Sequence, residues 1–431
     1  MTVSDGLVGG PLEGCRVVDL TRILSGPYAT MLLADLGAEV IKVERPGGGD
    51  DTRSWGPPFW GELSTYFAAV NRGKRSVVVD LSMEEGRELV RRLAATADVV
   101  TENFRPGVTR RLGLDYQTLA ADNPRLVYAS ISGFGSTGPK SQEAGTEVIV
   151  EAETGLMAMM GTPDGPPVRF GVAMVDIATG VTMISGVLAA LLQRERTGVG
   201  RYLEFPLFAT AMSAIGTVIT SASVDPESQR GRWGSGHPSI VPYSAFRALD
   251  GHVVLGAINE DMWERLCLAL DLAELLRDER TRGNQARVQH RRLVESGVGR
   301  AVSELPVAEV TRRLGARGVL VAPVKSADEA IQDPQVRHLG LVDVIDGVNF
   351  IRSPLAQFNP SSLPPAPNLG QDTAAVLQAH LGLGDAHIIR LRGLGVIHTT
   401  PPTEAPAVVT VQVSPAGAGT STDASPPLER I

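Results

Sequence analysis

The sequence has little cysteine, few aromatic residues and no excess of basic charge. Of its 431 residues, only Cys15 and Cys267 are cysteines, and 5% are aromatic. Two cysteines exclude a disulfide framework and a cysteine-rich zinc site, and they fit a reducing, cytoplasmic location. The formal net charge is -8 at pH 7. A mildly acidic chain lacks the electrostatic footprint of a nucleic-acid-binding protein, so we expect no nucleic acid as a main partner.

Signals for membrane insertion, secretion and metal binding are also missing. The longest apolar stretch, 181–192, is interrupted by Thr182, Ser185 and Gly186, so we expect no membrane span and no membrane partner. Residues 1–10 lack a basic and an apolar region, so we expect no secretory signal. The seven histidines are scattered without an HExxH pattern, so we expect no metal site. A dinucleotide GxGxxG, a Walker A loop and a GxSxG elbow are absent.

What is present is a regular alternation of strands and helices. The run RVVDL at 16–20 predicts a buried strand, and a helix follows from Pro27 to Leu36, where Gly37 ends it. EVIKVE at 39–44 is the next strand, so the three elements form a βαβ unit with parallel strands. Further strands are predicted at 76–81, 98–103 and 125–135, with a helix at 83–97. The pattern predicts a doubly wound α/β domain over the first half of the chain.

The second half begins with a long helix and ends in a segment of biased composition. Residues 173–197 read as a helix that is apolar on most sides, typical of a core or an interface. The Gly- and Pro-rich stretch 225–242 opens a smaller α+β unit, predicted over 225–330. Residues 331–397 contain short strands, Pro-rich links and a helix at 373–381. Residues 398–431 are rich in Pro, Thr, Ser and Ala, so we expect a disordered tail. Its VVTVQV run could instead add a strand to a partner's sheet edge.

Two loops and two carboxylates are candidates for chemistry. The loop ENFRPGVTRRLG at 102–113 gathers arginines beside a helix start, which suits an anion, although a solvated arginine face has the same pattern. ERPGGGDDTR at 44–53 combines a glycine run with Arg45 and Arg53, and a surface turn would look similar. Glu147 and Asp176 each precede an apolar helix. Either carboxylate could cap its helix, and a helix N-terminus would also keep a nucleophilic carboxylate ionised.

Taken in order, several motifs resemble the CaiB/BaiF family, the class III CoA-transferases. They are LTRILSGPYATMLLADLGAEVIKVERPGGGDDTR (20–53), NRGKRSVVVDL (71–81), ENFRPGVTRRLG (102–113), YASISGFGSTGP (128–139), LLQRERTGVGRYLE (191–204) and PAPNLGQDT (365–373). The resemblance covers about residues 11–395. It implies a Rossmann-like large domain formed by 11–224 and completed by 331–397, a small domain, and two subunits interlocked like rings in a homodimer.

The resemblance also implies which residues act. Asp176 falls at the family's nucleophile, and Glu147 at the position of a second carboxylate. A Gly-rich flap matches Gly234, Ser235, Gly236, His237 and Pro238. No tightly bound cofactor is implied, because coenzyme A enters as a thioester substrate together with a carboxylic acid. The expected CoA contacts are Arg22, Ser25, Arg45, Val79, Asn103, Phe104 and Arg111.

Two residues that differ from the pattern of other branches of the family narrow the predicted activity. Leu24 stands where the oxalate branch has a glutamine, which disfavours formyl-CoA:oxalate transfer. Thr146 stands where the racemase branch has a histidine base directly before the second carboxylate, and a racemase needs a base on each face of its substrate. A CoA-transferase is therefore predicted. A 2-methylacyl-CoA racemase and a non-catalytic CoA-binding protein remain as alternatives.

Overall fold

The computed structural model describes residues 10–227, 231–359 and 364–400, with the backbone of 408–409. Its largest feature is a seven-stranded sheet. Across the sheet the strands are β14 (Ile397–His398), β5 (Lys74–Val79), β2 (Glu39–Glu44), β1 (Arg16–Asp19), β6 (Val99–Glu102), β7 (Val127–Ser132) and β8 (Arg201–Pro206). All neighbours pair in parallel except β14, which lies antiparallel on the edge beside β5. The predicted α/β class is therefore confirmed.

The parallel strands follow the order of a doubly wound nucleotide-binding sheet. Numbered along the chain without β14, they lie in the spatial order 3-2-1-4-5-6. Val18 of β1 faces Ile41 of β2 on one side and Val100 of β6 on the other, so the winding reverses between β1 and β6. In such sheets the ligand lies outside the carboxyl ends of the strands at this switch point.

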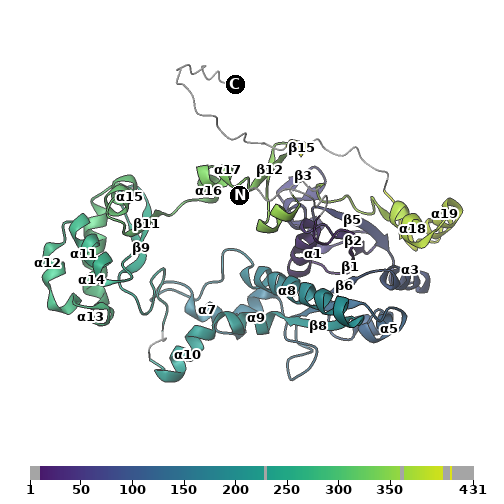
Figure 1. Cartoon of the computed structure of the whole chain (residues 1–431), viewed down its shortest axis with the longest axis horizontal. Helices are drawn as coiled ribbons and strands as arrows, with labels where there is room; N and C mark the ends of the chain where they lie inside the picture. The colour runs from purple at the N-terminus through teal and green to yellow at the C-terminus, as the bar shows by residue number, and fades with distance from the viewer. Residues whose placement is uncertain (1–9, 228–230, 360–363, 401–407, 410–431) are drawn as a thin grey trace, which may run out of the picture.

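Helices cover both faces of the sheet (Figure 1). On one face, α1 (Ser25–Asp35), α8 (Met174–Thr197) and α9 (Leu207–Ala214) share a core with Val17, Val99 and Val127. On the other, α3 (Glu84–Ala95), α5 (Tyr116–Asp122), α18 (Thr373–Leu381) and α19 (Asp385–Gly393) cover Val18, Val100 and Tyr128. Because successive strand residues point to opposite faces, a sheet buried on both sides needs continuous apolar strands. The runs in β1, β6 and β7 satisfy that need.

Helix α8 has the length and the apolar character of a membrane span, which the sequence analysis did not expect of any segment. It has 24 residues and a mean hydropathy of 1.9 in its most apolar window, so by length and composition it could cross a membrane. The bent pair α9 and α10 (Gly216–Val224) passes the same test. The prediction that no stretch reaches this length is wrong. Even so, Val175, Met183 and Val187 are buried in the core beside α1. A Cβ on Gly180 would come within 2.8 Å of the Ser25 carbonyl oxygen, so glycine permits this close packing.

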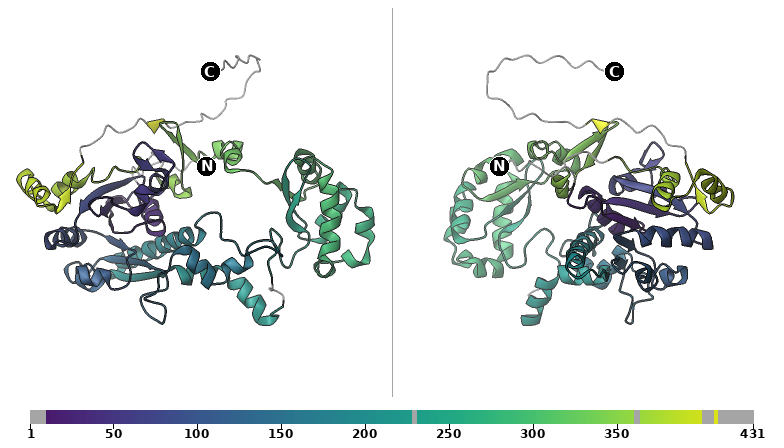
Figure 2. Two further views of the ribbon diagram at one scale, coloured as in Figure 1. Left: turned by 180° about the vertical axis from the view of Figure 1, so that it is seen from behind. Right: turned by 45° about the vertical axis from the view of Figure 1, so that its right-hand side comes forward.

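A smaller α+β unit has its own core. Its antiparallel sheet contains β9 (Tyr243–Arg247), β10 (His252–Gly256) and β11 (Leu320–Pro323). The helices are α11 (Glu260–Ala269), α12 (Ala273–Arg277), α13 (Asn284–Gln289), α14 (Arg291–Ser303) and α15 (Val307–Gly315). Trp263, Leu266 and Val298 are among the residues of a separate hydrophobic cluster. Figure 2 shows this unit set apart from the large sheet and joined to it by two connections.

After the small unit, the chain returns to the large sheet. It passes through α16 (Ala327–Ile331), α17 (Pro334–His338), the hairpin of β12 (Val342–Ile345) and β13 (Val348–Ile351), and the 3₁₀ turn Pro354–Phe358. Phe350 packs with Phe67 in a small cluster. Further on, the Ser76 amide donates to the Asp372 carboxylate at 2.9 Å. The two ends of the chain therefore build the large unit together.

The boundary of the predicted disordered tail differs in the structure. His398 pairs with Val78 through β14, and the Thr400 hydroxyl donates to the Leu369 carbonyl at 2.5 Å. Val408–Val409 form β15, which adds to β12 of the same chain rather than to a partner's edge. The prediction of disorder is wrong for these residues, because backbone pairing fixes them. The rest of the predicted tail, 401–407 and 410–431, lies outside the described residues.

Candidate active site

A tight turn follows β1 at the switch point. Ile23 has a φ of 71°, a left-handed conformation that is rare for a β-branched residue. Its amide donates to an Asp50 carboxylate oxygen at 3.3 Å. Asn103, directly after β6, accepts from the Arg22 amide at 2.8 Å and donates to the Arg22 carbonyl at 2.7 Å. The turn is therefore held from both neighbouring strands, and α1 begins at Ser25.

Two buried ion pairs hold this turn in place. Lys42 and Asp50 form a fully buried ion pair at 2.9 Å, and the Lys42 ammonium also donates to the Thr21 carbonyl at 2.8 Å. Lys74 and Asp19 form a second buried pair at 3.1 Å. Burial lowers the pKa of Lys74 to about 8, although the Asp19 charge opposes the shift. Breaking such pairs leaves an uncompensated buried charge, so the network makes the turn rigid.

A cavity of about 190 Å³ opens above the network, and it brings together four of the predicted CoA contacts. Arg22, Arg45, Val79 and Phe104 all line it. The Arg22 guanidinium lies 5.5 Å from the Phe104 ring centroid. Both arginines also contact Asp51, at 3.3 Å from Arg22 and 2.5 Å from Arg45. The two guanidinium groups are suited to an anionic ligand such as a phosphate, in a cavity that Asp80 also lines.

Arg111, another predicted CoA contact, does not line this cavity. It lies in α4 (Val108–Leu112), a helix without buried residues, and its side chain is exposed. Asn103 does not line the cavity but positions the turn through Arg22. Asp51 was not among the predicted site residues, because nothing in the run GGGDD distinguishes a paired carboxylate from a solvated one.

Asp176 is the third residue of α8 and is partly buried. It is not the N-cap, since Ala173 holds that position. The capping interpretation of Asp176 is therefore wrong. The Ser25 hydroxyl donates a hydrogen bond to the Asp176 carboxylate, which lowers its pKa, but burial has the larger effect and raises the pKa to about 6. The carboxylate lies at the start of both α1 and α8, close to the switch point.

Glu147 caps the helix that carries Asp176. Glu147 is the first residue of α6 (Glu147–Glu153), and its Oε1 accepts a hydrogen bond from the Val175 amide in the first turn of α8 at 3.0 Å. Burial raises the pKa of Glu147 to about 7, and the charges of Asp176 and Glu151 act in the same direction, whereas the hydrogen bond from Val175 and the charge of Arg169 oppose it. The structure thus brings both predicted carboxylates together.

Tyr66 is a site residue that the sequence did not indicate. It lies in α2 (Thr65–Val70), which follows the hairpin of β3 (Phe59–Trp60) and β4 (Leu63–Ser64). Burial, together with the nearby charges of Asp176 and Glu147, raises the pKa of Tyr66 to about 12. Its ring packs edge-on against Trp55, with centroids 5.3 Å apart. Since STYFAAV reads as an ordinary helix, only the tertiary contacts could reveal it.

The predicted flap lies between a large-unit loop and the small unit. The Gly234 amide donates to the Gly161 carbonyl at 3.0 Å. On the other side, the Ser235 and Ser244 hydroxyls are hydrogen-bonded at 3.0 Å, and the His237 ring stacks on Tyr243. Loop 161–165 leads towards α8, so the flap is connected to the segment that precedes Asp176. No interaction between the flap and Asp176 is found in the part of the chain that the structure describes.

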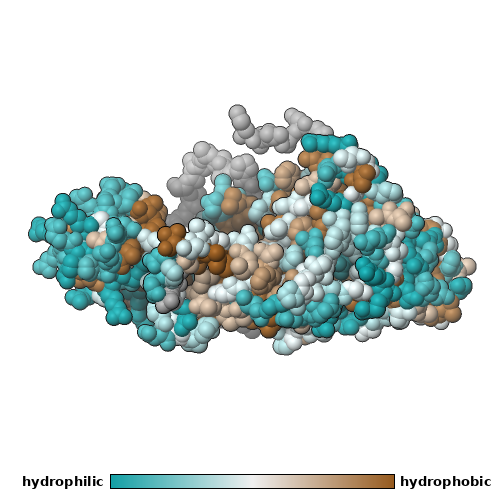
Figure 3. All heavy atoms as spheres, turned by 90° about the horizontal axis from the view of Figure 1, so that it is seen from below, coloured by the Kyte–Doolittle hydropathy of each residue, from teal (hydrophilic) through white to brown (hydrophobic). Residues whose placement is uncertain are grey.

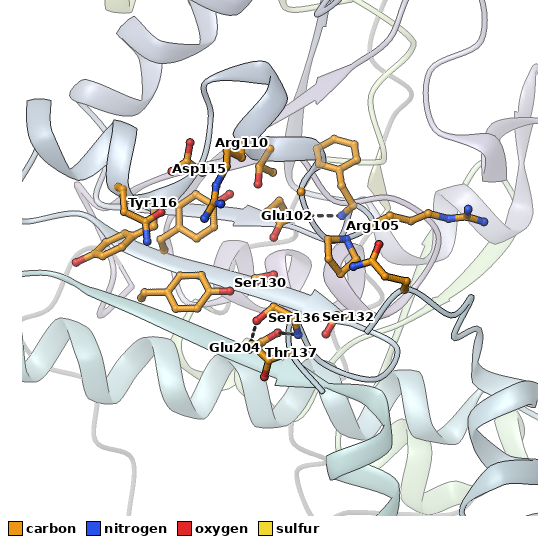
Figure 4. Close-up of a pocket in the computed structure, with 18 residues that line it drawn as sticks. Glu102, Arg105, Arg110, Asp115, Tyr116, Ser130, Ser132, Ser136, Thr137 and Glu204 are labelled. Atoms are coloured by element: carbon orange, nitrogen blue, oxygen red, sulfur yellow. Dashed lines mark hydrogen bonds between the residues drawn. The ribbon is translucent and has the colours of Figure 1, made fainter. Parts of the chain in front are cut away.

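A second cavity, of about 390 Å³, adjoins the first at Phe104, which lines both. The side chains around it come from β6, β7 and β8, from the loops that follow, and from α4 and α5, which carry the labelled Arg110 and Tyr116 (Figure 4). Arg105 and Arg110 of the predicted anion loop line it. Burial raises the pKa of Glu102 to about 7, and the Phe104 amide donates to Glu102 at 2.8 Å. The two cavities together form a continuous crevice from the switch point to the ends of β7 and β8, lined by arginines, carboxylates and aromatic rings.

Within residues 10–227, 231–359 and 364–400, no group of three or more His, Cys, Asp or Glu side chains is arranged to hold a metal ion. The site itself combines the partly buried Asp176 carboxylate with the Ser25 hydroxyl at the start of α1. A carboxylate whose pKa is raised to about 6 is ionised at neutral pH and more basic than a free one, which suits covalent catalysis.

The order of the parallel strands, with a crevice at the switch point, is that of the doubly wound α/β class. The chain belongs to CoA-transferase family III, whose model matches residues 12–373. The predicted family is thereby confirmed, and the protein is a class III CoA-transferase.

Named relatives and a solved structure agree with this assignment. The chain is 41% identical over 394 residues to a succinyl-CoA:glutarate CoA-transferase of Mus musculus, covering 90% of each protein. It is 39% identical over 383 residues to a succinate–glutarate CoA-transferase of Agrobacterium fabrum, covering 85% of this chain and 95% of that one. A crystal structure of a CaiB/BaiF family protein from Brucella suis has 38% identity and a TM-score of 0.78, over 86% of this chain and all of that one.

Proposed function

We propose that Asp176 is the nucleophile of a CoA transfer that runs through an aspartyl anhydride and an enzyme–CoA thioester. The observation that supports it best is the position of this carboxylate. Asp176 lies partly buried at the start of α8, with a pKa raised to about 6, and it is hydrogen-bonded to Ser25, which follows the crevice-lining Arg22 in the chain. Desolvation makes the ionised carboxylate more reactive, and the capping bond from Val175 to Glu147 fixes the helix start beneath it.

The first half of the reaction moves CoA onto the enzyme. An oxygen of Asp176 attacks the thioester carbonyl of the donor, the carbon–sulfur bond breaks, and CoA leaves as a thiolate. The product is a mixed anhydride between Asp176 and the donor acyl group. The thiolate then attacks the Asp176 carbonyl carbon, which releases the donor acid as a carboxylate. The energy of the thioester is kept at each step.

The second half repeats these steps in reverse. The carboxylate of the acceptor acid attacks the Asp176 thioester and displaces the CoA thiolate, forming a second anhydride. The thiolate then attacks the acceptor's carbonyl carbon. Asp176 is regenerated as a carboxylate, and the acceptor leaves as its CoA thioester. Water must be kept away throughout, and the proposed flap 234–238 would cover the anhydride.

The test is Asp176→Ala with a panel of acyl-CoA donors and carboxylic acids, read by mass spectrometry. We expect complete loss of transfer with unchanged CoA binding, because alanine has no carboxylate to attack the thioester. Wild-type protein incubated with donor alone should carry CoA on the peptide that contains Asp176. A variant that keeps more than a few percent of the wild-type turnover would show that another residue is the nucleophile.

A racemase is the alternative within the same family. Thr146 is the N-cap of α6 directly before Glu147, and it has no titratable group in the pH range of a proton-transfer base. We therefore propose transfer rather than racemisation. Exchange of the α-proton of a 2-methylacyl-CoA in deuterated water, without any acceptor acid, would favour the racemase.

We propose that the nucleotide end of CoA lies along Phe104 between the two cavities, near Arg22, Arg45 and Arg111. The support is the pair of cations in the first cavity and the exposed guanidinium on α4. Arg111→Ala should raise the Michaelis constant for acyl-CoA severalfold and leave that for the acid nearly unchanged. Equal effects on both substrates would instead indicate a structural role for Arg111.

We further propose that two copies form an interlocked homodimer. The outer face of α8 exposes Met174, Val181 and Leu192, and Ile219 and Val224 of α10 are also exposed. Figure 3 shows apolar residues gathered on one face between the small unit and the large one. Such a large apolar surface is typical of an obligate interface. Light scattering should report a dimer.

We also propose a cytoplasmic location. Cys15 and Cys267 are both free thiols, which fits a reducing compartment.

A further inference from the structure

One buried hydroxyl close to Asp176 has no hydrogen-bond partner. Thr179 lies in α8 with none of its surface exposed, and among the residues that the structure describes its hydroxyl forms no hydrogen bond. A buried polar group that stays unpaired destabilises the fold, because it has left water without replacing the bonds that it made there. Such a group needs an explanation outside the packing of the resting protein.

The other hydroxyls of α8 show what Thr179 does not do. Thr182, Ser185 and Thr197 each donate to the carbonyl oxygen four residues earlier in the helix, at 2.8, 3.0 and 3.0 Å. The Val175 carbonyl is the equivalent partner for Thr179, but within the described residues this bond is not formed. The Thr179 hydroxyl is therefore not tied to its own helix and can serve a group beside it.

Asp176 is the neighbouring side chain one turn earlier in α8. Residues three apart in an α-helix lie on the same face with Cβ atoms about 5–6 Å apart, and the later side chain leans towards the earlier turn. A Cβ on Gly180, which follows Thr179, would come within 2.8 Å of the Ser25 carbonyl oxygen, and the Ser25 hydroxyl donates to the Asp176 carboxylate. Thr179, Asp176 and Ser25 therefore come together where the start of α1 packs on α8.

The chemistry proposed for Asp176 needs hydrogen-bond donors that the resting carboxylate does not use. When the CoA thiolate attacks the Asp176 carbonyl carbon of the anhydride, negative charge develops on the carbonyl oxygen. The same oxygen becomes charged when the acceptor carboxylate attacks the enzyme–CoA thioester. Sites of acyl transfer stabilise this oxygen with donors that are already in position. Ser25 provides one hydroxyl, and a donor that is unpaired in the resting state would lower the barrier selectively.

We propose that the Thr179 hydroxyl is a second donor, which hydrogen-bonds together with Ser25 to the Asp176 oxygen that becomes negatively charged in each tetrahedral intermediate. This inference rests on the proposed function and adds a catalytic residue to it. The bond forms while the Asp176 carbon is tetrahedral, and it needs neither proton transfer nor a further reactant. It also accounts for a hydroxyl on a helix face where the buried neighbours Val175 and Met183 are apolar.

The test is Thr179→Val, which replaces the hydroxyl with a methyl group of about the same size. At pH 8, with an acyl-CoA and an acid that the wild-type protein uses, kcat should fall about 100-fold, the effect of losing one oxyanion donor. The Michaelis constant for the acyl-CoA should stay within about twofold, since the bond is absent from the ground state. The melting temperature should stay the same or rise, because the variant no longer buries an unpaired hydroxyl.

Two further variants and a pH profile complete the test. Thr179→Ser keeps the hydroxyl and should keep most of the wild-type kcat. Thr182→Val makes the same substitution one turn further along α8, at an exposed position, and should leave kcat within about twofold of the wild type. The pH at which kcat/KM is half-maximal should be the same in Thr179→Val as in the wild type, because Thr179 does not bind the resting carboxylate.

Several results would overturn the inference. They are a Thr179→Val variant with kcat within about threefold of the wild type, one that loses kcat and melting temperature together, and a Thr179→Ser variant as slow as Thr179→Val. A pH profile displaced to higher pH in Thr179→Val would show a bond to the resting carboxylate instead. Failure of the proposed function gives a different result, because the wild-type protein itself would then form no CoA adduct on the Asp176 peptide when incubated with the donor alone.

Discussion

At the scale of single residues, the two carboxyl groups beside α8 titrate within the range of an ordinary assay. Asp176 must be ionised to attack a thioester, and burial raises its pKa to about 6. We therefore expect kcat/KM for the acyl-CoA donor to rise about tenfold per pH unit below pH 6 and to level off above pH 7. Ser25→Ala removes a bond to the ionised form, so it should move the rise to higher pH. A rate that does not change between pH 5 and 8 would contradict this assignment.

The raised pKa of Asp176 also has a cost in stability. The shift from the ordinary 3.8 to about 6 means that the folded state binds the proton more tightly than the unfolded state. The stabilisation by the protonated form is complete below the unfolded pKa and is lost as the pH rises through about 6. Asp176→Asn should therefore raise the free energy of unfolding by about 2 kcal/mol at pH 8, with little gain at pH 3.5. Thermal melts at the two pH values, with Asp164→Asn in an exposed loop as the control, measure the difference.

Individual site residues could be predicted to different extents. Asp176 and Glu147 stand before apolar helices, and the order of the motifs assigned them roles. Tyr66 has no such signal, because its significance depends on its proximity to Asp176, about a hundred residues away in the chain. Arg111 shows the reverse case, where a motif position was predicted but the side chain lies exposed, outside the cavity.

At the scale of elements, the turn after β1 combines strain with buried charge. Ile23 has a φ of 71°, which costs a β-branched residue about 1–2 kcal/mol, and Asp50 accepts from its amide. Asp50→Ala removes this bond and leaves Lys42 without its ion-pair partner. We expect a loss of about 3–5 kcal/mol in the free energy of unfolding and a lower kcat, because Ser25 loses its fixed position.

A second variant separates strain from charge. Glycine adopts a positive φ without cost, so Ile23→Gly in the Asp50→Ala background should recover part of kcat while the stability stays low. A double-mutant cycle in urea and in turnover measures both effects. If the two substitutions were additive in kcat, the turn geometry would not be what Asp50 contributes.

Elements with a clear hydrophobic pattern were predicted well, whereas the two-residue β14 was not. The helix expected at 173–197 is α8 at Met174–Thr197, and the helix at 373–381 is α18 with the same bounds. The strand expected at 76–81 is β5 at Lys74–Val79, shifted by two residues because Lys74 is buried beside Asp19. β14 has only two residues, and its place on the edge beside β5 is set by tertiary packing alone.

At the scale of the whole molecule, the C-terminal segment that returns to the large sheet determines how far the chain can be truncated without loss of stability. Val396 and Ile397 are fully buried between α18, α19 and the sheet. A chain that ends at Gly395 should lose about 3–6 kcal/mol, which corresponds to a drop of several degrees or more in Tm. A chain that ends at Thr400 keeps these side chains and β14, and it should melt close to the full-length protein. Equal melting temperatures for the two truncated proteins would show that β14 contributes nothing.

The antiparallel β14 has a further consequence, for the time at which the fold can form on the ribosome. The large sheet gains its last strand only when residue 398 has emerged, after the whole small unit has been made. The small unit, with its own core, can fold first. Until residue 398 has emerged, the edge of β5 and the apolar surface that α18 and α19 later cover remain open to other nascent chains. Molecular chaperones would find their most accessible binding surface there, in a chain that is nearly complete but not yet closed.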